Sequence, residues 1–276
     1  TDESTPSEIS SVSLIENKWI ISRFNDTLEE FNQLFEKYKI SDAYKLLYNF
    51  LWSELFDWYF EFSKNLFNDE DKKIETQTVL KSTFLESLKL LNPAMPHITE
   101  EIWSSFNENY LIDNIWPSKF SEVSDDIFEI ENLKEIITKI RNFKSTYNLK
   151  NSLAIDLYSL DSYEDWFVNQ LEKTANVNIS VVESNLDDGV VLSFQSNDFV
   201  VSLLANKYID VESEIKRLNK KKVELNKSLE ISNNRLSNDK FVQNAKQELI
   251  DQEKQNVQHL NSQIESINST LNSLDN

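Results

Sequence analysis

The stretch LLNPAMPHITEEIW, Leu90–Trp103, decides the fold class of this 276-residue chain. It begins as the apolar end of one helix, contains two prolines three residues apart, and continues as a new helix. Pro93 ends the first helix, because the residue before a proline avoids helical torsions. Pro96 suits the first turn of the next helix, where its missing N–H is not needed. The stretch therefore predicts a sharp junction between two helices.

The composition favours long helices and excludes several kinds of chemistry. One glycine and four prolines leave little turn chemistry, and 39% hydrophobic residues can fill two or three domain cores. The absence of cysteine excludes disulfides, thiolate zinc sites and cysteine nucleophiles. Gly189 alone cannot build a phosphate loop, so we expect no nucleotide chemistry on this chain. No catalytic, metal-binding or cofactor-binding residue is predicted in it. No run of about 18 uncharged apolar residues and no signal-peptide pattern is present, which predicts a soluble cytoplasmic protein without membrane contact.

Helical periodicity covers the first 150 residues on both sides of the junction. The predicted helices run over Leu14–Tyr38, Asp42–Leu66, Lys73–Leu91, Pro96 to near Phe106, and Ile130–Asn148. Ser13 and Ser41 are the predicted caps of the first two helices. The aromatic residues of Trp52–Tyr59 are interpreted as core, with a ring that stacks on an unpaired base as the alternative.

The period changes to that of strands after Ser152. Alternation predicts strands over Leu153–Leu160, Val177–Glu183, Val190–Phe194 and Phe199–Leu204, and a helix over Tyr163–Lys173. Asp188 and Gly189 give a hairpin signal before the third strand. A small α/β module fits this pattern best.

The last 67 residues repeat at seven, in two heptad runs on either side of LSNDKFVQNA, Leu236–Ala245. This arrangement predicts an antiparallel coiled-coil hairpin, roughly 40 Å long for 25 helical residues. Lys222, Ser232 and Glu253 occupy core positions, where we expect them to weaken the arm and set its register. The predicted domains are a lead-in (1–13), a helical bundle (14–150), the α/β module (151–207) and the arm (208–276). Because the chain starts at Thr1, we expect it to be a piece of a longer protein.

Four stretches resemble a known family. NKWIISRFN (Asn17–Asn25), LYNFLWSELFDWYFEFSK (Leu47–Lys64) and the proline junction resemble, in order, helices of the anticodon-binding domains of class I aminoacyl-tRNA synthetases. LSNDKFVQNAKQELIDQEKQNV (Leu236–Val257) resembles the tip and return helix of the arm of the valyl members, whereas isoleucyl members usually end in a cysteine zinc module. The resemblance covers about Glu16–Asn276. It implies a mainly α fold with a class I anticodon-binding bundle, a small α/β linker module and a coiled-coil hairpin.

The resemblance implies that this chain binds and positions valine-specific tRNA, with the bundle on the anticodon and the arm on the tRNA body. The HIGH-type and KMSKS-type catalytic motifs of the family are absent, since His97 is followed by Ile98 and Thr99. Activation of valine with ATP and Mg, transfer to tRNA and editing therefore belong to a part of the presumed valine–tRNA ligase outside this chain. We expect no DNA partner and a monomer.

A net charge of −19 argues against binding a polyanion, but the charge is unevenly distributed. From Asp210 onward the net charge is −1, so the preceding residues carry −18. The candidate tRNA contacts are Arg23, Lys134, Lys139, Arg141, Lys144, Lys216, Arg217, Lys220, Lys221, Lys222 and Phe241. For the arm lysines the alternative is a solvated face, for Arg23 an ion pair in the bundle, and for Phe241 a plug of the hairpin turn.

A rival interpretation is an acidic helical scaffold whose coiled coil pairs with a protein partner, and a further one is the matching region of another class I synthetase. The oligomeric state separates a scaffold from a tRNA-binding chain. A hairpin arm leaves the chain monomeric, whereas an open heptad helix should dimerise.

Overall fold

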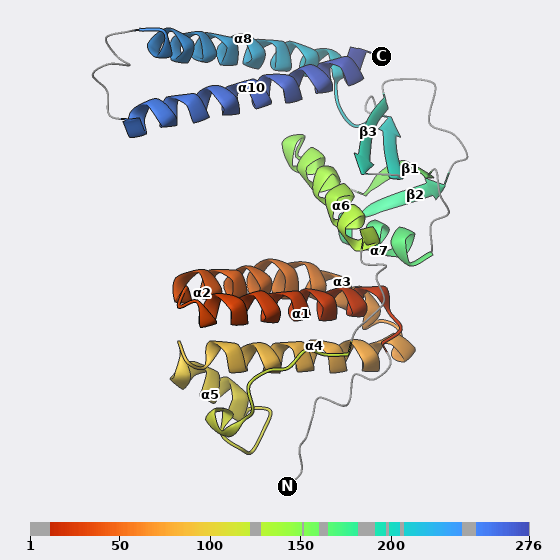
Figure 1. Ribbon diagram of the computed structural model, residues 1–276. Helices are drawn as coiled ribbons and strands as arrows, with labels where there is room; N and C mark the ends of the chain where they lie inside the picture. Colours follow the sequence, from red (N-terminus) through yellow and green to blue (C-terminus); the bar gives the residue numbers. More distant parts are fainter. Residues whose placement is uncertain are drawn as a thin grey trace. The chain divides into compact units, whose positions relative to one another are not determined.

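The computed structural model describes residues 12–121, 128–150, 152–159, 165–181, 191–196, 199–204, 207–238 and 247–275. Within them the chain is mainly helical and forms two compact units (Figure 1), which confirms the predicted fold class. Unit 1 contains the described residues up to Ile137 together with residues 165–175, and unit 2 contains the others. No helix of the described part has the length and apolar character needed to cross a membrane.

Unit 1 is a helical bundle with an aromatic core. Its elements are α1 (Ile15–Glu36), α2 (Ile40–Asn49), the π-helical segment η1 (Phe50–Tyr59), α3 (Phe60–Leu66), α4 (Glu70–Leu91), α5 (Pro96–Ser104), the 3-10 turn η2 (Leu111–Asp113), the first half of α6 (Phe128–Thr146), and α7 (Asp165–Ala175). The largest fully buried side chains come mainly from α1 and the continuous run α2–η1–α3, and include Trp19, Phe24, Phe31, Phe50, Tyr59 and Phe62. Apolar burial on this scale is the main stabilising term of the bundle.

The proline junction has the predicted form. α4 ends at Leu91, and Pro96 is the first residue of α5. Trp103 is buried with Leu88 and Leu111, and its indole N–H donates to the Asn109 carbonyl at 3.0 Å. The two helices are therefore held together by a small apolar cluster around the indole ring.

A hydrogen-bonded network of polar side chains crosses the bundle between α1, η1 and α4. Tyr59 Oη donates to Asn17 Oδ1 at 2.7 Å, and Asn17 Nδ2 donates to Glu75 Oε1 at 2.8 Å. Burial raises the pKa of Tyr59 well above its usual value, so the phenol keeps the proton that it donates. Because Asn17 and Tyr59 are both fully buried, each needs its partner at the right height on the neighbouring helix.

The predicted serine caps are wrong. Leu14 and Lys39 occupy the cap positions of α1 and α2, and neither makes a side-chain cap bond. The start of α1 is instead bound by Glu75 of α4, which accepts from the backbone N–H groups of Ser13 at 3.2 Å and Leu14 at 3.0 Å. A carboxylate makes charge-assisted bonds to these N–H groups and favours the positive end of the helix dipole, so it outcompetes a local hydroxyl.

The second predicted helix is continuous from Ile40 to Leu66 but is not regular, because η1 has π-helical hydrogen bonds. In an α-helix, residues four apart drift around the axis in one direction, since a turn takes 3.6 residues. In the wider π turns they drift the other way. The row of rings at four-residue spacing therefore stays on one exposed face, which consists of Tyr48, Trp52, Phe56 and Phe60.

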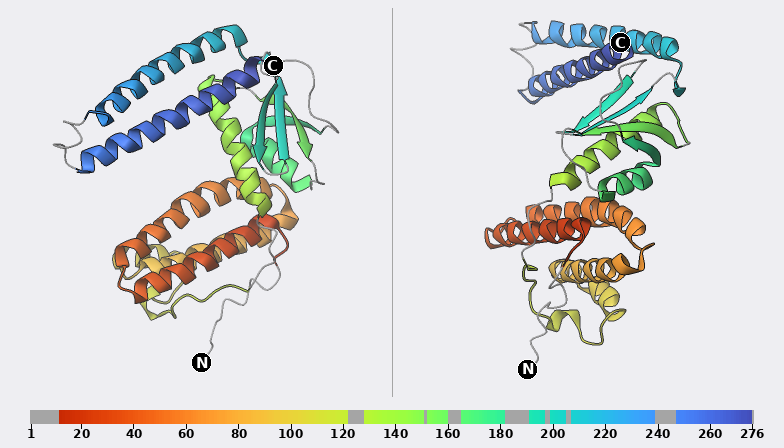
Figure 2. Two further views of the ribbon diagram at one scale, coloured as in Figure 1. Left: turned by 45° about the horizontal axis from the view of Figure 1, so that its top comes forward. Right: turned by 90° about the vertical axis from the view of Figure 1, so that its right-hand side faces the viewer.

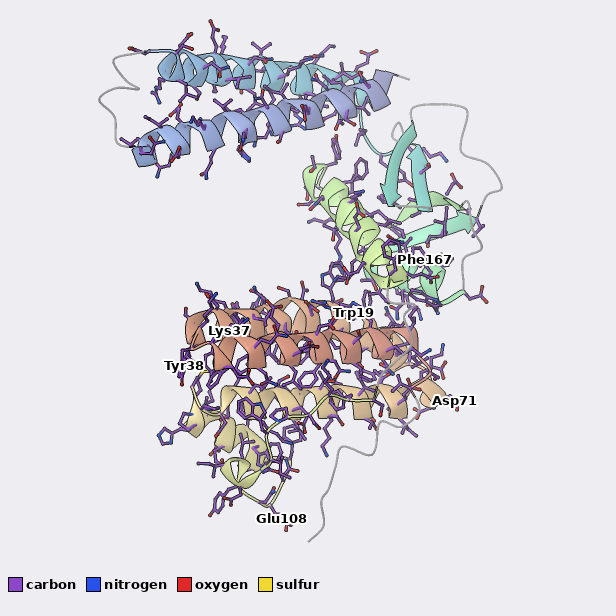
Figure 3. All side chains as sticks on the ribbon, viewed as in Figure 1. Trp19, Lys37, Tyr38, Asp71, Glu108 and Phe167 are labelled. Atoms are coloured by element: carbon purple, nitrogen blue, oxygen red, sulfur yellow. The ribbon has the colours of Figure 1, made fainter. Side chains whose placement is uncertain are left out.

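Tyr38, directly after α1, has a left-handed backbone with φ 58°. The N–H of Lys39 bonds to the Leu34 carbonyl at 2.9 Å and that of Tyr38 to the Phe35 carbonyl at 3.0 Å, as in a Schellman cap. For a residue with a Cβ atom this conformation is unfavourable by roughly 1–2 kcal/mol. The Tyr38 side chain projects from the end of the bundle (Figure 3), and the residue is 90% exposed.

Unit 2 contains a mixed four-stranded sheet of order β2-β1-β4-β3. Its elements are the second half of α6, β1 (Leu153–Ser159), β2 (Val177–Val181), β3 (Val191–Ser196), β4 (Phe199–Leu204), α8 (Val211–Leu236) and α10 (Gln247–Asp275). β1 is parallel to β2 and antiparallel to β4, which is antiparallel to β3. The predicted strands are confirmed, and the hairpin signal at Asp188 and Gly189 lies outside the described residues.

α8 and α10 lie side by side and antiparallel, as the views in Figures 1 and 2 agree. Asn256 Nδ2 donates to Ser232 Oγ at 3.0 Å, and Arg235 pairs with Glu253 at 3.6 Å. The contact partner of Arg235 is Glu253, and that of Ser232, three residues earlier on α8, is Asn256, three residues later on α10, as expected for antiparallel helices. Ser232 is buried and the Glu253 side chain is 15% exposed, which confirms both as inward-facing positions, and Lys222 is half-buried.

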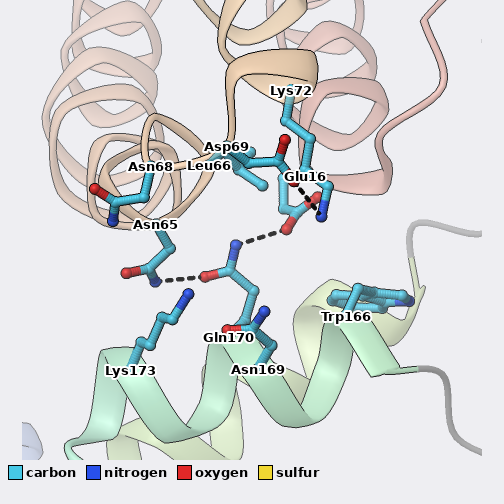
Figure 4. A pocket seen from close by; sticks show the side chains of 10 residues that line it. All are labelled: Glu16, Asn65, Leu66, Asn68, Asp69, Lys72, Trp166, Asn169, Gln170 and Lys173. Carbon is cyan, nitrogen blue, oxygen red and sulfur yellow. Dashed lines mark hydrogen bonds and ion pairs between the residues drawn. The ribbon is translucent and has the colours of Figure 1, made fainter.

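Glu16, in the first turn of α1, is the most buried carboxylate of a polar cavity of about 130 Å³ in unit 1 (Figure 4). It accepts a hydrogen bond from Gln170 Nε2 of α7 at 2.6 Å, and Gln170 Oε1 accepts from Asn65 of α3 at 2.7 Å. Burial raises the pKa of Glu16, and the bonds from its own backbone and Gln170 offset this only in part.

We therefore expect Glu16→Gln to stabilise unit 1 increasingly as the pH rises. A carboxyl whose folded pKa is raised contributes stability below its unfolded pKa, near 4.5, and loses it as the pH rises through the folded pKa. The amide of the Glu16→Gln variant does not ionise, so its contribution to the free energy of unfolding does not change with pH. Urea unfolding of both proteins between pH 4 and pH 8 measures the difference, which should be near zero at pH 4 and should favour the variant at pH 8. A difference that is independent of pH would contradict the assignment.

Candidate nucleic-acid interface

An exposed pair of rings with a nearby cation lies on the outer face of α2 and η1. The Tyr48 and Trp52 rings stack with their centroids 6.1 Å apart and their planes 5° apart, and the two residues are 60% and 64% exposed. Lys45 is exposed and lies one helical turn before Tyr48, on the same face. Flat aromatic rings beside cations are what proteins use to bind unpaired bases and their phosphates.

The interpretation of Trp52 as core is thus wrong, whereas Tyr59 is fully buried as predicted. The error comes from the helical period. If the helix were regular throughout, its widened apolar stripe would predict burial on two sides. In the structure the Tyr59 side of η1 faces α1 and α4, where its hydroxyl bonds to Asn17 and lies 3.5 Å from the Thr76 carbonyl. The π-helical turns keep the Tyr48–Trp52 row on an exposed side.

Arg23 forms the ion pair that was the alternative to an RNA contact. Its guanidinium donates to Glu54 through Nε at 2.6 Å and Nη2 at 3.0 Å, and lies 3.3 Å from Asp26. The bond to Glu54 raises the pKa of Arg23. The adjoining cleft of about 450 Å³ also contains Glu131 and Lys134, so its carboxylates outnumber its cations. A phosphate has little electrostatic reason to enter it.

Lys134 holds a structural position in the bundle. Its ammonium bonds to Glu131 at 3.0 Å and lies over the rings of Trp19 at 4.8 Å and Trp58 at 5.8 Å. The side chain is only 16% exposed. The ammonium is therefore already neutralised and covered before any ligand arrives.

The other three cations of α6 also have interactions within the molecule. Lys144 Nζ donates to the Asn176 carbonyl at 2.9 Å, and burial lowers the pKa of its ammonium. Lys139 and Arg141 are half-buried and interact with neighbouring groups as well. The basic island predicted on this helix is thus not a row of solvated side chains, although each cation stays a predicted contact.

The basic cluster at the base of the arm contains one paired cation, Arg217, and a group of exposed lysines. Arg217 binds Glu214 through two bonds of 2.6 and 2.7 Å, and Tyr147 Oη donates to the same carboxylate at 2.9 Å. Burial and then the bond to Glu214 raise the pKa of Tyr147 to about 12. The Tyr147–Glu214 bond therefore joins the start of α8 to the end of α6, and Arg217 neutralises the carboxylate that both groups share.

Lys216, Lys220 and Lys221 form the exposed part of this cluster. The Lys216 side chain is 80% exposed and lies 4.0 Å from Glu212, a distance at which an exposed pair contributes little. Lys220 and Lys221 are exposed and have no partner in the described part of the chain. Lys222 is half-buried, and Phe241 lies outside the described residues. Within the same described ranges, no group of three His, Asp or Glu side chains could hold a metal ion.

The structural and the solvated cations should respond differently to truncation. We expect Lys134→Ala to lower the free energy of unfolding of unit 1 by about 1–2 kcal/mol, because a partly buried cation over two indoles and a carboxylate is lost. Lys220→Ala is the control and should change it by less than about 0.5 kcal/mol. Urea unfolding followed by tryptophan fluorescence measures both. Equal stability of the two variants would show that Lys134 is not part of the packing.

Comparison with known proteins matches both units. The model of the anticodon-binding domain of tRNA ligases matches residues 17–159, and that of the valyl tRNA synthetase tRNA-binding arm matches residues 210–275. A valine–tRNA ligase of Petrotoga mobilis is 32% identical over 258 residues, which are 88% of this chain and 29% of the relative. Those of Mesoplasma florum and Pseudothermotoga lettingae are 30% and 31% identical, over 94% and 99% of this chain and 30% and 32% of the relatives.

This chain thus spans less than a third of the length of these relatives. The match to the anticodon-binding model covers more than half of the chain and includes α1 to α6, with the proline junction. The second match covers the antiparallel pair α8 and α10. The chain therefore belongs to the tRNA ligase family defined by this anticodon-binding domain, in its valyl-tRNA synthetase branch.

Proposed function

We propose that this chain binds valine tRNA, with the α2–η1 face on the anticodon loop and the arm on the tRNA body. The observation that carries the proposal is the exposed Tyr48–Trp52 stack beside Lys45, within the segment that matches an anticodon-binding domain. We propose that the complete protein attaches valine to this tRNA, as its relatives' name says of them, and that it uses the ATP and Mg that the family resemblance implies. That chemistry belongs to residues outside this chain, which lacks both catalytic motifs.

The two units contribute different parts of the binding energy. Bases in a single-stranded loop expose their faces and edges, so a stacking platform in unit 1 can discriminate between anticodons. Each stacked base contributes about 1–3 kcal/mol. Lysines on the arm contact phosphates, which every tRNA presents alike. Unit 1 thus supplies specificity, and the arm supplies affinity that depends on salt.

The position of the heptad residues argues against the alternative interpretation of a scaffold whose coiled coil pairs with a protein partner. Leu218, Leu260, Ile267 and Leu271 are buried where α8 and α10 pack against each other within one chain. Their apolar surface is then not available to a second coiled-coil partner. We propose a monomer, which sedimentation equilibrium can test directly.

Trp52→Ala should weaken binding of valine tRNA by about tenfold and reduce its preference over the same tRNA with a replaced anticodon. The exposed ring contributes little to folding, so the melting temperature should stay the same. Filter binding with both tRNAs measures the two affinities. Tyr110→Ala, which removes a ring that is 69% exposed on a different segment of unit 1, is the matched control and should change neither. Unaltered discrimination in the Trp52 variant would rule out the platform.

Replacing Lys220 and Lys221 together by Gln should weaken all tRNAs alike and lower the slope of log affinity against log salt by about 2. The physical reason is the loss of two ammonium groups that displace counterions from phosphates. Titrations at four salt concentrations give the slope. Lys227→Gln with Lys254→Gln removes the same charge from exposed positions farther along the arm. If both double variants lose the same affinity for tRNA and show the same drop in salt slope, the net charge of the arm and not the Lys220–Lys221 pair explains the binding.

A further inference from the structure

The turn between α1 and α2 presents an aromatic ring at the tip of unit 1, between two cations. Tyr38 is 90% exposed, and within the described residues its side chain has no hydrogen bond and no aromatic ring partner. Lys37 and Lys39 on either side are exposed and likewise lack an ion-pair partner in the described part of the chain. Figure 3 shows Lys37 and Tyr38 together at the end of the bundle.

The backbone of Tyr38 is unfavourable for its residue type. Among the described residues, three that are not glycine have a positive φ, and each follows the end of a helix. Two of them, Asn148 and Asn176, are of the type that tolerates the left-handed conformation. Tyr38 is not of that type, and at 90% exposure its side chain buries little surface in return. A tyrosine at this position therefore works against the stability of the turn.

The charge around the ring favours an anionic occupant. Lys37 and Lys39 directly flank the ring and are exposed, and with Glu36 and Asp42 they bring residues 36–42 to a net charge of zero in a chain of net charge −19. Asp42 also lies in the first turn of α2, where the helix dipole already stabilises its charge. An exposed ring between two ammonium groups is complementary to an unpaired base flanked by phosphates.

We propose that the turn Lys37–Lys39 is a second RNA contact, separate from the Tyr48–Trp52 stack, in which the Tyr38 ring stacks on an unpaired loop base. Lys37 and Lys39 bind the phosphates on either side of that base. The inference rests on the proposed tRNA binding and adds a residue that nothing in the sequence pattern indicated. The left-handed backbone holds the ring away from the bundle, so the ring is in place before the RNA binds.

The test uses the whole chain and two variants of one residue. Tyr38→Asn supplies the residue that the backbone prefers and removes the ring, whereas Tyr38→Phe keeps the ring and the strain. The probes are the anticodon stem–loop hairpin of valine tRNA and a fully paired duplex of the same stem.

We expect Tyr38→Asn to raise the melting temperature by about 2–4 °C and to weaken hairpin binding by about 5- to 100-fold. Tyr38→Phe should match the parent in both measurements. The duplex should bind the parent and both variants equally, because it offers no unpaired base. A variant that is more stable and yet binds less cannot be explained by damage to the fold.

Two results would overturn the inference, and they are distinguishable. If the parent binds the hairpin and Tyr38→Asn binds it equally well, the turn is not an RNA contact while the proposed function stands, and the ring is then a candidate contact for a protein partner. If the parent binds neither the hairpin nor complete valine tRNA, the proposed function and the inference fail together.

Discussion

The hydrogen-bonded chain from Glu75 through Asn17 to Tyr59 is the constraint on which the helical bundle depends. It joins α4, α1 and η1 through bonds of 2.8 and 2.7 Å, and Asn17 and Tyr59 are fully buried. Sliding any of the three helices by one turn would leave a buried polar group without its partner, at a cost of about 1–3 kcal/mol. The network therefore fixes the register of the aromatic core, and with it the face that η1 presents to solvent.

The sequence predicts the parts of the fold that depend on local rules. A proline at a helix start, a strand alternation and a heptad each restrict the backbone by themselves, so the junction at Pro96, the strand Phe199–Leu204 and the antiparallel arm could be predicted. The caps could not, because the group that binds the start of α1 belongs to Glu75, about sixty residues away. The π-helical turns of η1 could not either, since periodicity analysis assumes one period for the whole helix.

The sequence indicates which residues are cations but not which of these cations are solvated and able to contact RNA. Lys134 and Arg23 were singled out as cations, yet whether a cation is solvated depends on the acidic or aromatic side chains that the fold brings beside it. Glu131 and Glu54 neutralise them, and two indoles cover the Lys134 ammonium. In the cluster Lys216–Lys222, Lys216, Lys220 and Lys221 are solvated, because a long exposed helix offers its lysines fewer neighbours. The rings are predicted less well: Trp52 is interpreted as core with base stacking as the alternative, and Tyr38 is not indicated at all, because aromatic residues are more often buried.

The polar layer of the arm has a mechanical consequence. Ser232, Asn256, Arg235 and Glu253 lie near the end of α8 and the start of α10, and one buried oxygen of Glu253 has no hydrogen-bond partner. Of the buried leucines and isoleucines described in the arm, Ile250 lies at this distal end, whereas Leu218, Leu260, Ile267, Leu271 and Leu274 lie along the rest and pack the helices more tightly. The apolar packing between α8 and α10 thus weakens from the base of the arm, at the start of α8, towards its tip, at the end of α8. We therefore expect the two helices to unfold locally from the tip while the base remains folded. The tip of such an arm can adapt to the curved surface of a large partner at little energetic cost, while the well-packed base keeps the arm in a fixed direction.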